Sequence, residues 1–237
     1  MRACIKPELA AWERRCALAI LGAWLAFFGL FSVASAIYPG GNWLDRAARG
    51  HAFFANYFCD LTQPVSLSGV NNPLGSRLAQ LALLCFAVAL AAFFWLVPRY
   101  FVSGTRSGVW VRRLGQCAVL SYVAVPLTPS AQFGEVHAWL ALSSGAFGIA
   151  AALCAVGALW RSARTARGLA VVGAAALVVG TLHALLFVHY MHGREPAPLI
   201  VPAAQKVAAL LLSAWMLAVA GLTLFGEWSN RHRESAR

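Results

Sequence analysis

The chain has 237 residues, of which 60% are hydrophobic and only 11% are charged, and its formal net charge is +11. Soluble domains carry about 25% charged residues, so this composition excludes an ordinary soluble protein and is typical of a membrane protein. No polar segment is long enough to bury a core of its own, and we therefore expect a single domain over residues 1–237.

Six apolar stretches are long enough to cross the hydrocarbon core of a bilayer, which requires about 20 residues of helix. They cover residues 16–37, 78–98, 108–127, 137–160, 168–190 and 207–228. The third is the weakest, because Pro126 and Pro129 limit its outer end. The first superficially resembles a secretory signal peptide, but its apolar run exceeds the usual length of about 7–15 residues. The predicted fold class is an all-α integral membrane protein, a bundle of six transmembrane helices.

Basic residues lie mainly on one side of these spans. The two terminal segments and the connections after the second and fourth spans hold 14 of the 19 Lys and Arg residues. The other side holds Arg46, Arg49, Arg77, Arg194 and Lys206. Because cytoplasmic loops of bacterial membrane proteins are enriched in Lys and Arg, the N- and C-termini are predicted to be cytoplasmic, in a bacterial inner membrane. Anionic lipid headgroups account for the positive charge, and no nucleic-acid partner is expected.

The only long connection, residues 38–77, follows the first span. It opens with Pro39-Gly40-Gly41, a turn signal, and Asn42 is then expected to cap a short helix. Several of its side chains are too apolar for a freely solvated loop: Phe53, Phe54, Tyr57, Phe58 and Leu61. We therefore expect an ordered outer loop that lies along the membrane surface or over the bundle.

Within this loop, residues 56–72 read NYFCDLTQPVSLSGVNN and place a carboxylate, amides, hydroxyls and a thiol beside lipid. Each of these groups would cost a few kcal/mol if it were buried without a hydrogen-bond partner. Three interpretations stay open: a hydrogen-bonded plug that closes the outer end of the bundle, a binding or catalytic pocket, or a surface that docks a membrane protein partner.

Five of the six histidines also fall in the outer half, namely His51, His137, His183, His189 and His192. His183 lies about 9 Å deeper than His189 on a straight helix and about 120° around it, so one helix cannot supply all the ligands of a metal. The metal candidates are His183, His189, His192 and Asp60, and zinc is a possible cofactor, although no metal-binding signature is present. Cys59 is the only outer-face thiol, and no nucleophile motif surrounds it.

The stretches YPGGNWLD and NYFCDLTQP resemble a group of bacterial six-helix integral membrane proteins of undefined activity. That group is in turn similar to the eukaryotic Frag/DRAM/Sfk-like proteins, whose first outer loop carries a short motif centred on Ser or Cys followed by Asp. The matching positions are Asn56, Cys59, Asp60 and Leu61, with Asn71 and Asn72 as further matches. The resemblance implies a lipid-facing role and no defined reaction. A fainter similarity links the chain to ceramidase-like membrane hydrolases, whose paired-His spacing it lacks.

The leading hypothesis from the sequence is a multi-pass inner-membrane protein with a polar outer-face pocket for a lipid headgroup or a small polar ligand. Its ligand-binding residues would be Asn56, Cys59, Asp60, His51, His137 and His183. The first alternative is a metal-assisted lipid hydrolase with its site at the same face, although a non-enzymatic role is favoured. The second is a non-catalytic subunit that docks a partner through the outer loop.

Overall fold

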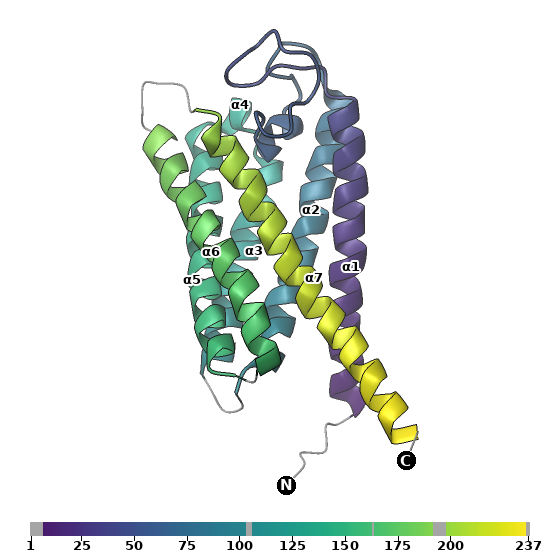
Figure 1. The fold of residues 1–237 in the computed structure, drawn as a ribbon. Helices are drawn as coiled ribbons and strands as arrows, with labels where there is room; N and C mark the ends of the chain where they lie inside the picture. Colours follow the sequence, from purple (N-terminus) through teal and green to yellow (C-terminus); the bar gives the residue numbers. More distant parts are fainter. Residues whose placement is uncertain (1–6, 103–105, 163, 192–197, 236–237) are drawn as a thin grey trace.

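The computed structural model describes residues 7–102, 106–162, 164–191 and 198–235, and the side chains of all of these except 7–10, 164–165 and 226–235. Seven α-helices and two 3-10 helices make up the regular structure of these residues (Figure 1). The α-helices are α1 (Pro7–Ala36), α2 (Pro73–Leu96), α3 (Ser107–Leu127), the short α4 (Ser130–Phe133), α5 (Glu135–Trp160), α6 (Arg164–Met191) and α7 (Ile200–Ser235). The 3-10 helices are η1 (Phe58–Thr62) and η2 (Val97–Tyr100).

The six long helices form a closed ring. Each packs against its neighbours in chain order, from α1 through α2, α3, α5 and α6 to α7, and α7 returns to pack against α1. The first residue of α1 and the last residue of α7 lie at the same end of the bundle, and the long loop after α1 covers the opposite end (Figure 1).

Five of these helices are long and apolar enough to cross a membrane, within Ala11–Ala36, Pro73–Tyr100, Glu135–Trp160, Ala166–Met191 and Ile200–Phe225. Five of the six predicted spans are therefore confirmed as apolar helices of sufficient length. The remaining one, predicted over residues 108–127, corresponds to α3, which is not among the five and carries Arg112 and Arg113 within its first turns. It ends at Leu127, as Pro126 and Pro129 predict.

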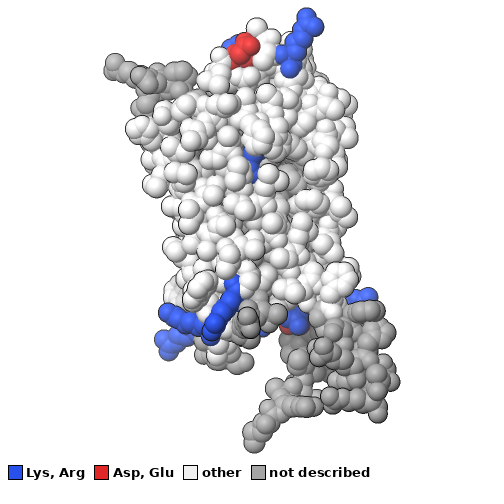
Figure 2. Space-filling view, in the orientation of Figure 1, with Lys and Arg blue, Asp and Glu red and all other residues white. Residues whose placement is uncertain are grey.

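The core is an apolar cluster of small, aliphatic and aromatic side chains where the long helices meet. Ala17 and Ile20 of α1, Phe93 of α2, Leu159 of α5 and Met216 of α7 belong to one buried cluster. Large apolar side chains also point outward, and Leu120 and Phe225 are each 73% exposed. An apolar outer surface of this kind suits a lipid environment. Figure 2 shows charged side chains gathered at the two ends of the molecule, with a largely uncharged band between them.

The outer loop differs in its bounds from the prediction. It spans residues 37–72, because α2 begins at Pro73 instead of residue 78. Proline is favoured at the first position of a helix, where its missing N–H would have no partner in any case. Asn42 does not cap a helix, which corrects that prediction. Its Oδ1 accepts hydrogen bonds from the backbone N–H groups of Leu44 and Asp45 at 2.9 and 2.8 Å and closes a turn instead.

Candidate functional site

The outer loop folds back on itself through Tyr38 and Gly41. The Tyr38 hydroxyl donates to the Gly41 carbonyl at 3.4 Å and accepts from the Leu67 N–H at 3.1 Å. Gly41 has a φ of +86°, and a Cβ there would lie 2.4 Å from the backbone nitrogen of Ser68. Only glycine permits this crossing of two chain segments, and the crossing holds the first half of the loop over the second.

Asp60 is the centre of the polar stretch. It belongs to η1 and is 4% exposed. Its Oδ1 accepts from the Trp43 indole at 3.0 Å, and its Oδ2 accepts from the Tyr57 N–H at 2.8 Å and from the Asn56 amide at 3.2 Å. A carboxylate has about four acceptor sites, so about one remains for another donor.

Asn56 joins Asp60 to the rest of the loop and to α7. Its fully buried side chain donates to the Gly41 carbonyl at 2.9 Å as well as to Asp60, and it accepts from the Ala52 N–H at 3.0 Å. The Asn56 backbone carbonyl accepts a hydrogen bond of 2.5 Å from Nζ of Lys206. Every polar group of Asn56 named here therefore has a partner.

Lys206 is the residue that the sequence reasoning placed on the outer side without giving it a role. It is 0% exposed and lies on α7. Its ammonium lies 4.1 Å from the centroid of the Phe58 ring and 5.5 Å from that of Phe53. A cation over aromatic faces is stabilised by their quadrupoles, more strongly where water is excluded. A lone lysine inside an apolar run was the signal that could have revealed it.

Other polar side chains tie the loop to the surrounding helices. Gln205 of α7 accepts from the Phe58 N–H at 3.0 Å, and Gln63 donates to the Ser130 hydroxyl of α4 at 2.8 Å. Asn72 donates to the Leu61 and Gln63 carbonyls, at 3.3 and 3.2 Å. These bonds are the network expected of a plug, and most of the polar side chains of residues 56–72 take part in it.

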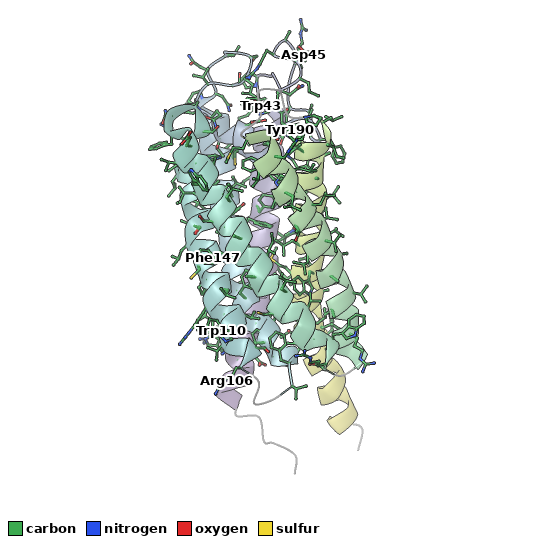
Figure 3. The ribbon with its side chains drawn as sticks, turned by 90° about the vertical axis from the view of Figure 1, so that its left-hand side faces the viewer. Trp43, Asp45, Arg106, Trp110, Phe147 and Tyr190 are labelled. Carbon is green, nitrogen blue, oxygen red and sulfur yellow. The ribbon has the colours of Figure 1, made fainter. Side chains whose placement is uncertain are left out.

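Below the plug lies a cavity of about 630 Å³ inside the ring. Its outer end is lined by loop residues Trp43, Tyr57, Cys59 and Asp60, and its deeper walls mainly by apolar residues of α2, α3, α5, α6 and α7. Figure 3 shows Trp43 and Tyr190, which both line it, near the loop, whereas Trp110 and Arg106 lie at the opposite end. Small-molecule sites usually have volumes of about 300–1,000 Å³, so this space is large enough for a ligand.

Four of the predicted site residues line this cavity, namely Cys59, Asp60, His137 and His183, whereas Asn56 does not. Nδ1 of His137 lies 2.7 Å from the Thr128 carbonyl, and Nδ1 of His183 lies 3.2 Å from the Val201 carbonyl. A carbonyl can only accept, so each ring carries its proton on Nδ1. Nε2 is then the nitrogen that each neutral histidine has available as an acceptor.

His51 does not join them. It is absent from the cavity wall and packs edge-on among the rings of Phe31, Tyr38 and Phe53. Its Nε2 is buried without a hydrogen-bond partner among the described residues. Burial, and secondarily the charge of Lys206, lower the pKa of His51 to about 4, so its ring is neutral at physiological pH.

The described residues bring no three His, Cys, Asp or Glu side chains together in a way that could hold a metal ion. His189 is exposed and stacks edge-on against Tyr190 at 4.8 Å, and His192 lies outside the described residues. The metal-assisted hydrolase therefore gains no geometric support from the part of the chain that the structure describes.

Burial also shifts the pKa values of the two loop acids, Cys59 and Asp60. It raises the pKa of the Cys59 thiol to about 12, helped by the negative charge of Asp60. A protonated thiol is a poor nucleophile, which argues against catalysis by Cys59. Burial raises the pKa of Asp60 as well, and its three hydrogen bonds and the charge of Lys206 oppose that rise.

Small residues shape the cavity wall. Small residues often let two helices approach closely. Gly173 of α6 is such a position, because an added Cβ would lie 2.6 Å from the indole of Trp215. At Gly145 of α5 and Gly180 of α6 an added Cβ would meet nothing within 4 Å, and both glycines line the cavity.

Sequence reasoning missed Trp43, Tyr57, Ser130, Gln205 and Lys206 as parts of the site. Trp43 and Tyr57 lie in the stretches YPGGNWLD and NYFCDLTQP, but only polar neighbours such as Asn56 and Asp60 were taken as site residues. Gln205, beside Lys206, interrupts the apolar run of α7, and such polar residues in a span are usually functional or paired.

The fold and site together define a helical bundle of membrane-protein type, with a polar loop that closes one end of an internal cavity. Comparison of the chain with protein-family models, with curated proteins and with solved structures yields no match.

Proposed function

We propose that the chain is a six-helix protein of a bacterial inner membrane, with both termini in the cytoplasm, and that its outer end binds a lipid headgroup or a small polar ligand. The observation that carries this proposal is the buried Asp60 carboxylate, which has acceptor capacity to spare at the top of a 630 Å³ cavity also lined by His137 and His183.

The count of six spans rests on the place of α3 in the ring. It packs between α2 and α5, and without it the ring would be open. Its 21 residues extend about 32 Å, enough for a hydrocarbon core of about 30 Å. Arg112 and Arg113 lie near its start, where long side chains reach the interface and keep their charge in water.

The orientation rests on the distribution of the described arginines. At the end where α1 begins they are Arg14, Arg15, Arg99, Arg106, Arg112, Arg113, Arg161 and Arg167, and Figure 2 shows basic side chains gathered there. The opposite end holds Arg46, Arg49 and Arg77 together with acidic residues. By the positive-inside rule, this distribution supports a periplasmic outer loop.

Cysteine labelling tests this orientation. In a background with the native cysteines replaced by serine, Asp45→Cys and Arg161→Cys each supply one exposed thiol at opposite ends. A membrane-impermeant maleimide should label the cysteine at position 45 in intact cells and the one at position 161 only after permeabilisation. The reverse pattern would overturn the proposed orientation and the periplasmic location of the site.

The chemistry of the site suits a hydrogen-bonding ligand. Asp60 and the Nε2 atoms of His137 and His183 can accept, while the hydroxyls of Ser130 and Tyr190, which also line the cavity, can donate. Polar groups that converge on an otherwise apolar cavity are the usual arrangement of a small-molecule site.

A pair of histidine variants on one helix tests the binding. His183 lines the cavity, whereas His189 is exposed and does not. Wild type, His183→Gln and His189→Gln would be purified in a mild detergent, and the molecules that co-purify would be extracted and quantified by mass spectrometry. We expect His183→Gln to lower the occupancy of the bound molecule and His189→Gln to leave it unchanged. Equal occupancy in all three proteins would refute the site.

The resemblance of Asn56, Cys59, Asp60 and Leu61 to the loop motif of the Frag/DRAM/Sfk-like group supports a lipid-facing role for the same site. We propose that Asp60 and Asn56 of this motif organise the plug, since their side chains contact each other, and that Asp60 also faces the ligand.

A further inference from the structure

We propose that the ligand is a single-chain amphiphile, with its acyl chain in the cavity and an uncharged, hydroxyl-bearing headgroup of the monoacylglycerol class at Asp60, His137 and His183. This inference rests on the proposed function and specifies the class of ligand bound at the same site.

The length of the cavity matches one acyl chain. Along α5 its wall extends from His137 to Ala152, which is about 22 Å at 1.5 Å per residue. Along α6 it extends from Met191 to Ala176, again about 22 Å. An acyl chain of one leaflet spans about half of a hydrocarbon core of about 30 Å, which is about 15 Å. An acyl chain whose headgroup lies at the outer end of the cavity therefore reaches the deep part of its wall.

Two aromatic residues mark the deep part of the cavity. Phe94 of α2 packs on Gly115 of α3, where an added Cβ would lie 2.2 Å from its ring. Trp215 of α7 packs on Gly173 of α6 in the same way, at 2.6 Å. Both aromatic side chains line the cavity, and each packs closely on a glycine of the neighbouring helix. They form the floor of the cavity, where the end of an acyl chain would lie.

Between the polar mouth and this floor, two glycines keep the wall of the cavity wide. Gly145 of α5 and Gly180 of α6 line it, and an added Cβ at either would meet no atom within 4 Å. An apolar space with a polar mouth fits a molecule that is apolar along its length and polar at one end.

The lining also limits the headgroup. Among the described residues of the cavity wall there is no Lys or Arg, and Lys206 is turned to Asn56, Phe58 and Phe53. Phosphate recognition usually relies on Arg or Lys, so an anionic headgroup beside Asp60 is disfavoured. The hydroxyl groups of an uncharged headgroup can donate hydrogen bonds to Asp60 and to the two histidines, and they can accept one from Ser130.

A pair of glycine variants on α5 tests the position of the chain. Gly145 lines the cavity and Gly157 does not, and an added Cβ meets nothing within 4 Å at either. Gly145→Leu fills the path of a long chain, whereas Gly157→Leu makes the same helix substitution elsewhere. Displacement of radiolabelled monopalmitoylglycerol from purified full-length protein would be measured with unlabelled monopalmitoylglycerol, monooctanoylglycerol and palmitoyl lysophosphatidic acid.

Gly145→Leu should weaken palmitoyl binding about tenfold relative to octanoyl binding, since overpacking typically costs about that much, and Gly157→Leu should not change the ratio. Lysophosphatidic acid should compete more weakly than monopalmitoylglycerol. An unchanged ratio in Gly145→Leu, equal competition by lysophosphatidic acid, or no binding of monopalmitoylglycerol to wild type would each overturn the inference. If His183→Gln still lowers occupancy of the co-purified molecule, the proposed function survives that failure.

A second measurement does not depend on the folding of Gly145→Leu. Monopalmitoylglycerol brominated near the end of its chain should quench the fluorescence of Trp215 by contact. Total tryptophan quenching should therefore be smaller in Trp215→Phe than in wild type. With monopalmitoylglycerol brominated beside the headgroup, wild type and Trp215→Phe should be quenched equally. If the loss of quenching in Trp215→Phe is the same for both brominated molecules, the chain does not end at Trp215 and the inference is overturned.

Discussion

Lys206 offers the sharpest test of how the outer loop is held, because it is a fully buried residue whose hydrogen bond and cation–π contacts reach residues of that loop. Its Nζ donates to the Asn56 carbonyl at 2.5 Å and lies 4.1 Å from the centroid of Phe58. Lys206→Met retains an unbranched side chain of similar length and removes the charge and the donor. The matched control is Val207→Met, the next residue of α7, which is 40% exposed.

The magnitude follows from the two contacts. A hydrogen bond from a charged donor contributes about 1.5–3 kcal/mol, and a cation–π contact contributes about 0.5–2 kcal/mol. Their lower values together give about 2 kcal/mol, which is a roughly 30-fold change in the equilibrium for local opening of the loop. Global stability should change less, because removing the charge also removes the cost of burying it.

Hydrogen exchange read by mass spectrometry measures this local opening. The Tyr57 and Phe58 amides report directly, since they donate to Asp60 and to Gln205. We expect their exchange to rise roughly 30-fold in Lys206→Met and to stay at the wild-type rate in Val207→Met. Unchanged or slower exchange of both amides in Lys206→Met would refute the assignment of Lys206 as the anchor of the loop.

Two further predictions concern stability in detergent. His51 has a pKa of about 4 in the folded protein against 6.5 without its surroundings, so the unfolded chain takes up the proton first as the pH falls. Relative to His51→Gln, the melting temperature of wild type should therefore drop between about pH 6.5 and pH 4 and stay constant above pH 6.5; a constant gap throughout would contradict this. Gly173→Ala, which would bring a Cβ to 2.6 Å from the Trp215 ring, should destabilise the folded protein by about 1–3 kcal/mol. Gly157→Ala, where an added Cβ meets nothing within 4 Å, should not. Equal melting temperatures of the two variants would contradict the tight packing of Trp215 on Gly173.

The membrane architecture could be predicted because it depends on composition averaged over long stretches. Five apolar runs appear as long helices, and the bounds differ mainly where polar ends extend a helix beyond its apolar part, as in α1 and α7. The helix expected after Asn42 was wrong because the Asn42 side chain serves equally well to close a turn, and only the contacts of Gly41 with Leu67 and Ser68 decide between the two.

The site was predictable only in part, for a geometric reason. Asp60, His137 and His183 were recognisable as polar groups at one end of the bundle, and all three line the cavity. His51 is likewise a polar residue at that end of the bundle, yet its ring packs among the aromatic rings of Phe31, Tyr38 and Phe53. Side-chain direction within an irregular loop follows from tertiary contacts that no sequence periodicity encodes. The role of Lys206 was hidden for the same reason, since its partner is a backbone carbonyl 150 residues away.

The most direct test of the account is an experimental density map of the protein purified without delipidation. The account predicts one continuous, elongated density inside the ring, with its polar end within hydrogen-bond distance of Asp60 or His183 and its other end against Trp215 and Phe94. A cavity filled by protein side chains, or one that contains only separate water peaks, would contradict it.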